Sequence, residues 1–269
     1  MLGASREALT AAREALDARR GDPQFASLPA DLLAVAALLD RESALRSALA
    51  DAGQPSQVRA GLVGDVLGGR VSPLAVDVVT AVVQQRWSSD LDLLLGIEQL
   101  AYQAAFTVAE ADATLDATED EIFTFGRAVD ASSALQMALT DPAQPSATKA
   151  AIVDDLLAGR TTDTTRQVLG YAVGHLHGQR IDAVVDALVA LAARQRERLV
   201  AEVTVAAQLD DEQHRRLADA LSRMKGRAVR VNVDIDPAVL GGVHVRIGDE
   251  VIDGTVAARL EQARRTVLA

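Results

Sequence analysis

The side chains of this sequence that could do chemistry are a few histidines and a run of acids. His175 and His177 stand two positions apart near the end of an expected helix. Their side chains therefore point to different faces and cannot share a metal ion as an i, i+4 pair would. The acids between residues 110 and 121 invite comparison with a calcium loop, but the glycine and the ligand spacing of such a loop are absent. Neither group predicts a metal site.

Motifs for an activated nucleophile or a phosphate-binding loop are also missing from the sequence. The glycines between residues 61 and 69 are not followed by the lysine of a phosphate loop, and no strand precedes them. No serine lies in a nucleophile-elbow motif. The chain has no cysteine, which excludes disulfides, thiolate metal sites and cysteine nucleophiles. We therefore expect no catalytic residues and no cofactor.

The composition and the charge indicate an acidic helical protein. Hydrophobic residues make up 49% of the 269 residues and aromatic residues only 3%, which suits helix bundles better than ligand pockets lined with rings. The formal net charge is −11. Residues 1–199 hold 17 basic and 27 acidic side chains, a net charge of −10, and the remainder holds 10 and 11. Such a region repels phosphate backbones and favours basic or amphipathic peptides, so nucleic acid is not an expected partner.

The sequence contains no pattern typical of a signal peptide or of a membrane span. Arg6 and Glu7 stand where a signal peptide would place apolar residues. No charge-free apolar run approaches the roughly 18 residues of a spanning helix. We expect a soluble chain that is at most peripheral to a membrane.

An internal repeat organises the helical part of the chain. Residues 39–70 align without a gap on residues 129–160, an offset of 129 − 39 = 90 residues, and the identical pairs include Leu49 with Leu139. Each copy is predicted to form a helix, a Pro-Ser turn that starts the next helix, and a glycine that ends it. The helical part is therefore a duplication, and its two copies could form one merged bundle or two separate bundles.

Short strands are predicted only beyond residue 200. Residues 202–207 and 229–235 are expected to form strands, the second on its alternation of apolar and polar side chains, and residues 243–252 indicate a hairpin with a two-residue loop. Between the first two strands, Asp210 and Gln213 make the capping box of a helix. A final helix is expected to close this small domain.

The C-terminal residues resemble the signature of one family. An Asp-Pro pair, a Gly-Gly pair, an alternating strand, a Gly-Asp turn and Asp-Gly-Thr follow one another at fixed spacings. This order is similar to the C-terminal signature of the ATP synthase delta subunit family, which includes the mitochondrial oligomycin sensitivity-conferring protein (OSCP). In this family the motif builds the domain and catalyses nothing. The matching residues are Asp236, Pro237, Leu240, Gly241, Gly242, Gly248, Asp249, Asp253, Gly254, Thr255 and Leu260.

The resemblance implies a fold and a division into domains. The fold would be mainly α with a small α/β C-terminal domain, in which tandem or merged helical bundles precede a β-α-β-β-α-like domain. Residues 102–269 would correspond to a complete family member, with the N-terminal helical bundle at 102–199 and the stalk-binding domain at 200–269. Residues 1–101 would be an extra copy of the bundle.

The resemblance also implies a mechanical function. The chain would be a non-catalytic stator component that links the catalytic head of the proton-translocating ATP synthase to its peripheral stalk. It would lie on the cytoplasmic face of the bacterial cell membrane and help to couple proton flow to ATP synthesis. The bundle would bind the amphipathic N-terminal helix of an alpha subunit, and the C-terminal domain would bind a b-type stalk subunit.

The candidate groove for the alpha subunit lies between the first and fifth helices of the bundle. Its expected residues are Tyr102, Ala105, Phe106, Val168, Leu169 and Ala172. The same spacing is equally typical of ordinary bundle core. For the function of the whole chain, the alternative is a soluble helical adaptor or regulator that shares the delta scaffold.

Overall fold

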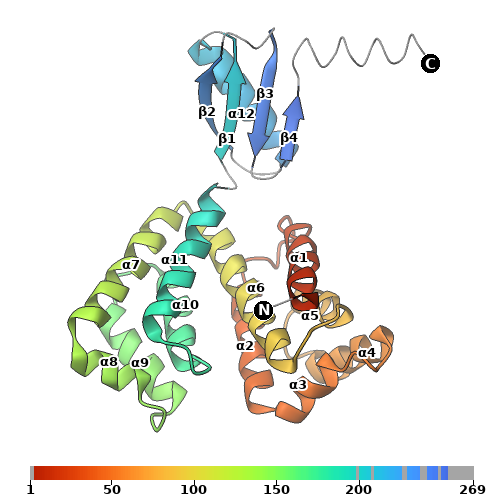
Figure 1. Cartoon of the computed structure of the whole chain (residues 1–269), viewed down its shortest axis with the longest axis vertical. Coiled ribbons are helices and arrows are strands. Elements are labelled where there is room, and N and C mark those ends of the chain that lie inside the picture. Colours follow the sequence, from red (N-terminus) through yellow and green to blue (C-terminus); the bar gives the residue numbers. More distant parts are fainter. Residues whose placement is uncertain are drawn as a thin grey trace. The chain divides into compact units, whose positions relative to one another are not determined.

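The computed structural model describes residues 3–197, 200–206, 209–225, 229–236, 241–247 and 250–253 (Figure 1). The chain divides into two compact units, residues 1–192 and residues 193–269. The first unit is helical and the second is built on a small sheet. The predicted fold class, mainly α with a small α/β domain, is confirmed.

Eleven helices begin in the described part of the first unit, and they follow one another through short turns. They are α1 (Ala4–Asp17), α2 (Leu28–Arg41), α3 (Ser43–Ala50), α4 (Ser56–Leu67), α5 (Pro73–Gln84), α6 (Asp90–Ala111), α7 (Leu115–Ala131), α8 (Ser133–Thr140), α9 (Ser146–Leu157), α10 (Asp163–Gly174) and α11 (Ile181–Glu197). No described helix has both the length and the apolar character that a membrane span requires.

The internal repeat is visible in the helices. α3 and α4 of the first copy correspond to α8 and α9 of the second, at the offset of 90 residues. Pro55 and Pro145 are the N-caps of α4 and α9. Both helices end just before a glycine with positive φ, +72° at Gly69 and +68° at Gly159. The glycine without a Cβ takes this conformation at little cost, so the predicted helix stops are confirmed.

Each copy has its own hydrophobic core, and α6 contributes to both. The first core takes residues 93–104 of α6 together with α1, α2 and α5. The second core takes Ala105, Phe106 and Ala109 from the far end of α6 together with α7, α10 and α11. In all, 13 of the 22 residues of α6 are buried. The two copies are therefore joined through a shared helix, and the boundary expected between residues 101 and 102 falls inside it.

The second unit contains a four-stranded mixed sheet. Its strands are β1 (Val200–Val205), β2 (Arg230–Ile235), β3 (Val243–Ile247) and β4 (Glu250–Asp253), in the order β2-β1-β3-β4. β1 pairs in parallel with β2 and antiparallel with β3, and β3 pairs antiparallel with β4. β1 starts two residues earlier than expected, because Val200 and Ala201 pair with Arg230 and Val231.

Helix α12 (Asp211–Lys225) connects β1 to β2. Its predicted capping box is confirmed, because the backbone N–H of Gln213 donates to the Asp210 carboxylate at 2.7 Å and the backbone N–H of Asp210 donates to the Gln213 side chain at 3.0 Å. Leu221 of α12 is buried with Val203, Val231 and Val245 of the sheet. The final helix expected after residue 255 lies outside the described residues.

Candidate partner-binding site

The residues predicted to form a groove between the first and fifth helices lie on α6 and α10. Ala105 and Phe106 of α6, and Val168, Leu169 and Ala172 of α10, are all at most 1% exposed and belong to the second core. Tyr102 is half-buried and lies at the border of both cores. The structure thus brings all six residues together as the packed seam between α6 and α10, and Tyr102 reaches its edge.

An apolar cleft of about 350 Å³ opens beside Tyr102. It lies where α1 of the first copy and α11 of the second copy approach the middle of α6. Most of its lining is apolar, and the polar residues include Glu98, Gln99 and Gln179. An apolar cleft with a few polar groups is the form of site that accepts the hydrophobic face of a helix. The apolar lining includes Leu9, Leu95, Tyr102, Val184, Leu188 and Leu191.

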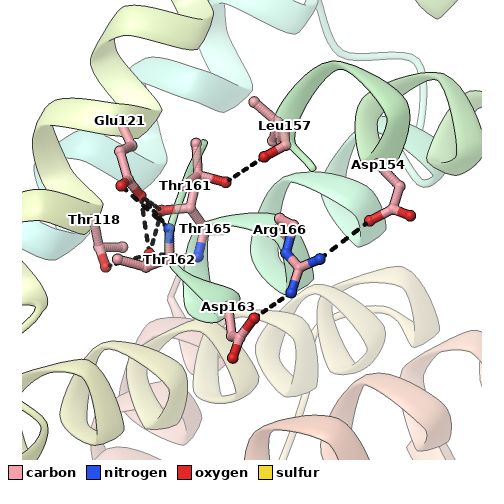
Figure 2. A network of polar contacts seen from close by, with 9 residues as sticks. All are labelled: Thr118, Glu121, Asp154, Leu157, Thr161, Thr162, Asp163, Thr165 and Arg166. Atoms are coloured by element: carbon pink, nitrogen blue, oxygen red, sulfur yellow. Dashed lines mark hydrogen bonds and ion pairs between the residues drawn. The ribbon is translucent and has the colours of Figure 1, made fainter. Parts of the chain in front are cut away.

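The start of α10 is held in place by a carboxylate of α7. Glu121 accepts hydrogen bonds from the backbone N–H of Thr162 at 2.9 Å, from the Thr162 hydroxyl at 2.9 Å and from the Thr165 hydroxyl at 2.6 Å. Figure 2 shows these side chains converging on Glu121, with Thr118 joining through the Thr162 hydroxyl at 3.1 Å. A carboxylate at a helix N-terminus also interacts favourably with the helix dipole. This network fixes the end of one of the two helices that form the seam.

A second polar cluster lies at the border between the copies. Glu98 of α6, only 5% exposed, accepts hydrogen bonds from the Tyr171 hydroxyl at 2.9 Å and from Nε2 of His177 at 2.8 Å. Nδ1 of His177 lies 3.7 Å from a carboxylate oxygen of Asp40, at the end of α2. His175 stacks on the Tyr171 ring with the ring centres 4.0 Å apart. The sequence had indicated only a partly exposed helix end here.

The electrostatics of this cluster favour a charged histidine and neutral tyrosines. The hydrogen bond to Glu98 raises the pKa of His177 and outweighs the opposing effect of burial. Burial, followed by the charge of Glu98, raises the pKa of Tyr171 far above its ordinary value. Burial likewise raises the pKa of Tyr102. Both tyrosines therefore remain protonated at any physiological pH, and Tyr171 keeps its hydrogen bond to Glu98.

The C-terminal signature is described in part. Asp236 follows β2 directly, and its backbone N–H donates to the carbonyl of Val205 at 2.9 Å. Gly241 and Gly242 have φ values of +74° and +85°, so the sequence correctly indicated that this pair requires positive φ. Asp253 pairs in register with His244 across β3 and β4. The remaining signature residues, Pro237, Leu240, Gly248, Asp249, Gly254, Thr255 and Leu260, lie outside the described residues.

The comparisons with known proteins give the same assignment as the signature. A family model described as the ATP synthase delta (OSCP) subunit matches residues 101–267. The chain belongs to the ATP synthase delta (OSCP) subunit family. It is accordingly a non-catalytic subunit of ATP synthase with a stator function.

Several relatives in the delta family are similar over almost their whole length. Proteins named ATP synthase subunit delta are 45% identical over 265 residues in Streptomyces avermitilis and 43% identical over 267 residues in Streptomyces griseus. A third, in Parafrankia sp., is 44% identical over 275 residues. These alignments cover 98% of this chain in each case, and 97%, 98% and 99% of the relatives. The additional bundle copy is therefore not peculiar to this chain.

Proposed function

We propose that the helical unit binds the amphipathic N-terminal helix of an alpha subunit and that the C-terminal domain binds a b-type stalk subunit. In this arrangement the chain holds the catalytic head against the torque of the central shaft, at the cytoplasmic face of a bacterial membrane. A stator joint of this kind needs tight holding and no reactive group. Membership of the delta family supports the proposal.

The observation that carries the proposal for the alpha subunit is the apolar cleft beside Tyr102. The predicted seam residues other than Tyr102 are enclosed in the core, so a partner helix reaches the site through the cleft that Tyr102 lines. Residues 1–199 carry a net charge of −10, which favours a basic or amphipathic peptide. We expect the apolar face of the partner helix to supply most of the affinity and the acidic surface to supply a salt-dependent part.

A pair of alanines on α11 gives a matched test of the cleft. Ala187 lines the cleft and is exposed, whereas Ala190 is exposed on the same helix outside the lining. Ala187→Glu places a carboxylate where the apolar face would dock, and Ala190→Glu adds the same charge elsewhere. We expect Ala187→Glu to weaken binding of an alpha N-terminal peptide at least about tenfold, equivalent to about 1.4 kcal/mol, and Ala190→Glu to leave it unchanged.

Fluorescence anisotropy of a labelled peptide measures this difference, and circular dichroism checks that both variants keep their helices. Equal affinities for the two variants would remove the cleft from the site. Affinity purification of the tagged chain from solubilised membranes separates the stator function from a free adaptor. Co-purification of alpha and b-type subunits supports the proposal, and a soluble chain that brings down neither contradicts it.

A further inference from the structure

The cluster of Asp40, Glu98, Tyr171 and His177 connects the two copies of the bundle. Asp40 lies in the last turn of α2 in the first copy, Glu98 lies on the shared helix α6, and His177 lies between α10 and α11 of the second copy. We propose that this cluster is a pH-sensitive latch, in which protonated His177 holds the second copy against the first and neutral His177 releases it.

The internal repeat shows that the bundle itself does not require three of the four cluster residues. At the offset of 90 residues, His177 corresponds to Trp87, Tyr171 to Ala81 and Glu98 to Ala8. Trp87 is buried in the first core, and a Cβ added to Gly96 of α6 would lie only 2.4 Å from its ring. The three polar side chains thus replace apolar ones at equivalent positions. They occur where the second copy faces the first.

The backbone at His177 also departs from that at its counterpart. His177 has a φ of +48°, a left-handed conformation that non-glycine residues adopt at some cost. The structure describes Trp87, and its φ is not positive. This backbone accompanies an imidazole that contacts α6 and α2 and is only 10% exposed. The contacts made by the ring offset the unfavourable backbone.

The geometry favours a charged imidazole. Nε2 of His177 lies 2.8 Å from Glu98 and Nδ1 lies 3.7 Å from Asp40, so a carboxylate faces each ring nitrogen. Neutral imidazole carries one N–H, and its other nitrogen would direct a lone pair at a carboxylate in either tautomer. Only the imidazolium donates toward both groups. The buried carboxylate of Glu98 also needs this positive charge, because the Tyr171 hydroxyl supplies a hydrogen bond but no charge.

The sign of the pH dependence follows from the raised pKa of His177. The hydrogen bond to Glu98 raises this pKa most, and the charges of Glu98 and Asp40 raise it further. Burial and the guanidinium of Arg46 on α3 lower it. A histidine in an open latch titrates near its ordinary value of about 6.5. The latch is therefore complete below about pH 6.5 and is lost as the pH rises through the raised value. The other ionisable side chains around the cluster are Tyr102, Tyr171 and His175, of which the tyrosines stay neutral.

Single-molecule energy transfer between the two copies tests the latch in the full chain. The sequence has no cysteine, so Val58→Cys on α4 and Met137→Cys on α8 give specific labels at side chains that are 56% and 68% exposed. At pH 6 we expect one narrow distribution of transfer efficiencies, that of the closed latch. As the pH rises above the ordinary histidine pKa, we expect a second, open population that grows by up to about tenfold per pH unit. An unchanged distribution between pH 6 and pH 8 would overturn the proposal.

Matched variants show whether His177 is the titrating group. Asparagine tolerates left-handed backbone and does not titrate, so His177→Asn should abolish the response to pH. His214→Asn, in the C-terminal unit, should keep the response of the parent. Asp40→Asn removes one carboxylate at a half-exposed position and should move the response to lower pH. A pH response in His177→Asn equal to that of the parent, or no shift in Asp40→Asn, would refute the latch.

Discussion

Replacing Glu121 with alanine tests how α10 is positioned, because the duplicated chain contains a weaker version of the same contact. In the first copy, Asp31 stands at the position of Glu121 and Ser72 at the position of Thr162. Asp31 accepts a hydrogen bond from the backbone N–H of Ser72 at 3.1 Å, in place of the three groups that donate to Glu121. The two sites therefore differ in the number of bonds and not in their place in the fold.

The expected magnitudes follow from this difference. Hydrogen bonds to a charged group contribute about 1.5–3 kcal/mol each, but the hydroxyls of Thr162 and Thr165, 2.9 Å apart, can bond to each other once Glu121 is removed. The loss at Glu121 is then the backbone bond of Thr162, the part of the two hydroxyl bonds that this exchange does not recover, and the favourable interaction of the carboxylate with the helix dipole, whereas Asp31→Ala loses one longer backbone bond. We expect Glu121→Ala to lower the free energy of unfolding by about 3 kcal/mol, and Asp31→Ala by about 1 kcal/mol.

Urea denaturation followed by far-ultraviolet circular dichroism measures both values. Fluorescence of Trp87, the one tryptophan of the sequence, reports separately on the first copy. The control is Asp120→Ala, which removes an exposed acid of α7 next to Glu121 and should change stability by less than about 0.5 kcal/mol. The reasoning fails if Glu121→Ala costs no more than this control, or if the Glu121 and Asp31 variants lose equal stability.

Two further predictions concern the repeat and the C-terminal unit. Leu49 and Leu139 are equivalent buried residues at 2% and 0% exposure, so truncating either to alanine should lower the free energy of unfolding by about 2–5 kcal/mol in urea titrations. A large difference between the two would show that the copies pack differently around them. Asp210→Ala should cost about 1 kcal/mol and speed hydrogen exchange in the first turn of α12, because it removes half of the capping box. Unchanged exchange in that turn would mean that the cap contributes little.

The features that were predictable from the sequence are those with local causes. Proline at the start and glycine beyond the end act on the backbone within a few residues, so α4 and α9 could be placed from their own sequences. The capping box of α12 and the alternation of β2 are local in the same way. The C-terminal signature could be matched because its turns require particular residue types at fixed spacings. These features were sufficient to assign the family.

The features that were not predictable depend on contacts between distant segments. Apolar residues at helical spacing form the same sequence pattern whether they line a groove or fill a core. The pattern therefore could not show that five of the six groove candidates are core residues. The contact between Asp40 and His177 spans 137 positions of sequence and has no local signal. The repeat did contain one indication of this contact, because His177 aligns with Trp87 and Tyr171 aligns with Ala81. A polar residue in one copy opposite an apolar residue in the other marks a position with a different environment.

The sharing of α6 has a mechanical consequence for a stator subunit. Two bundles joined by a flexible linker could rotate against each other, and a load on one would reach the other only through the linker. Here 22 residues of continuous helix, about 33 Å long, contribute side chains to both cores. A load applied to one copy is therefore carried to the other by packed side chains and by the hydrogen bonds of one helix. Relative motion of the copies then requires bending of α6 or sliding at its sides. The cleft and the cluster around His177 lie at those sides, so relative motion of the copies would change both.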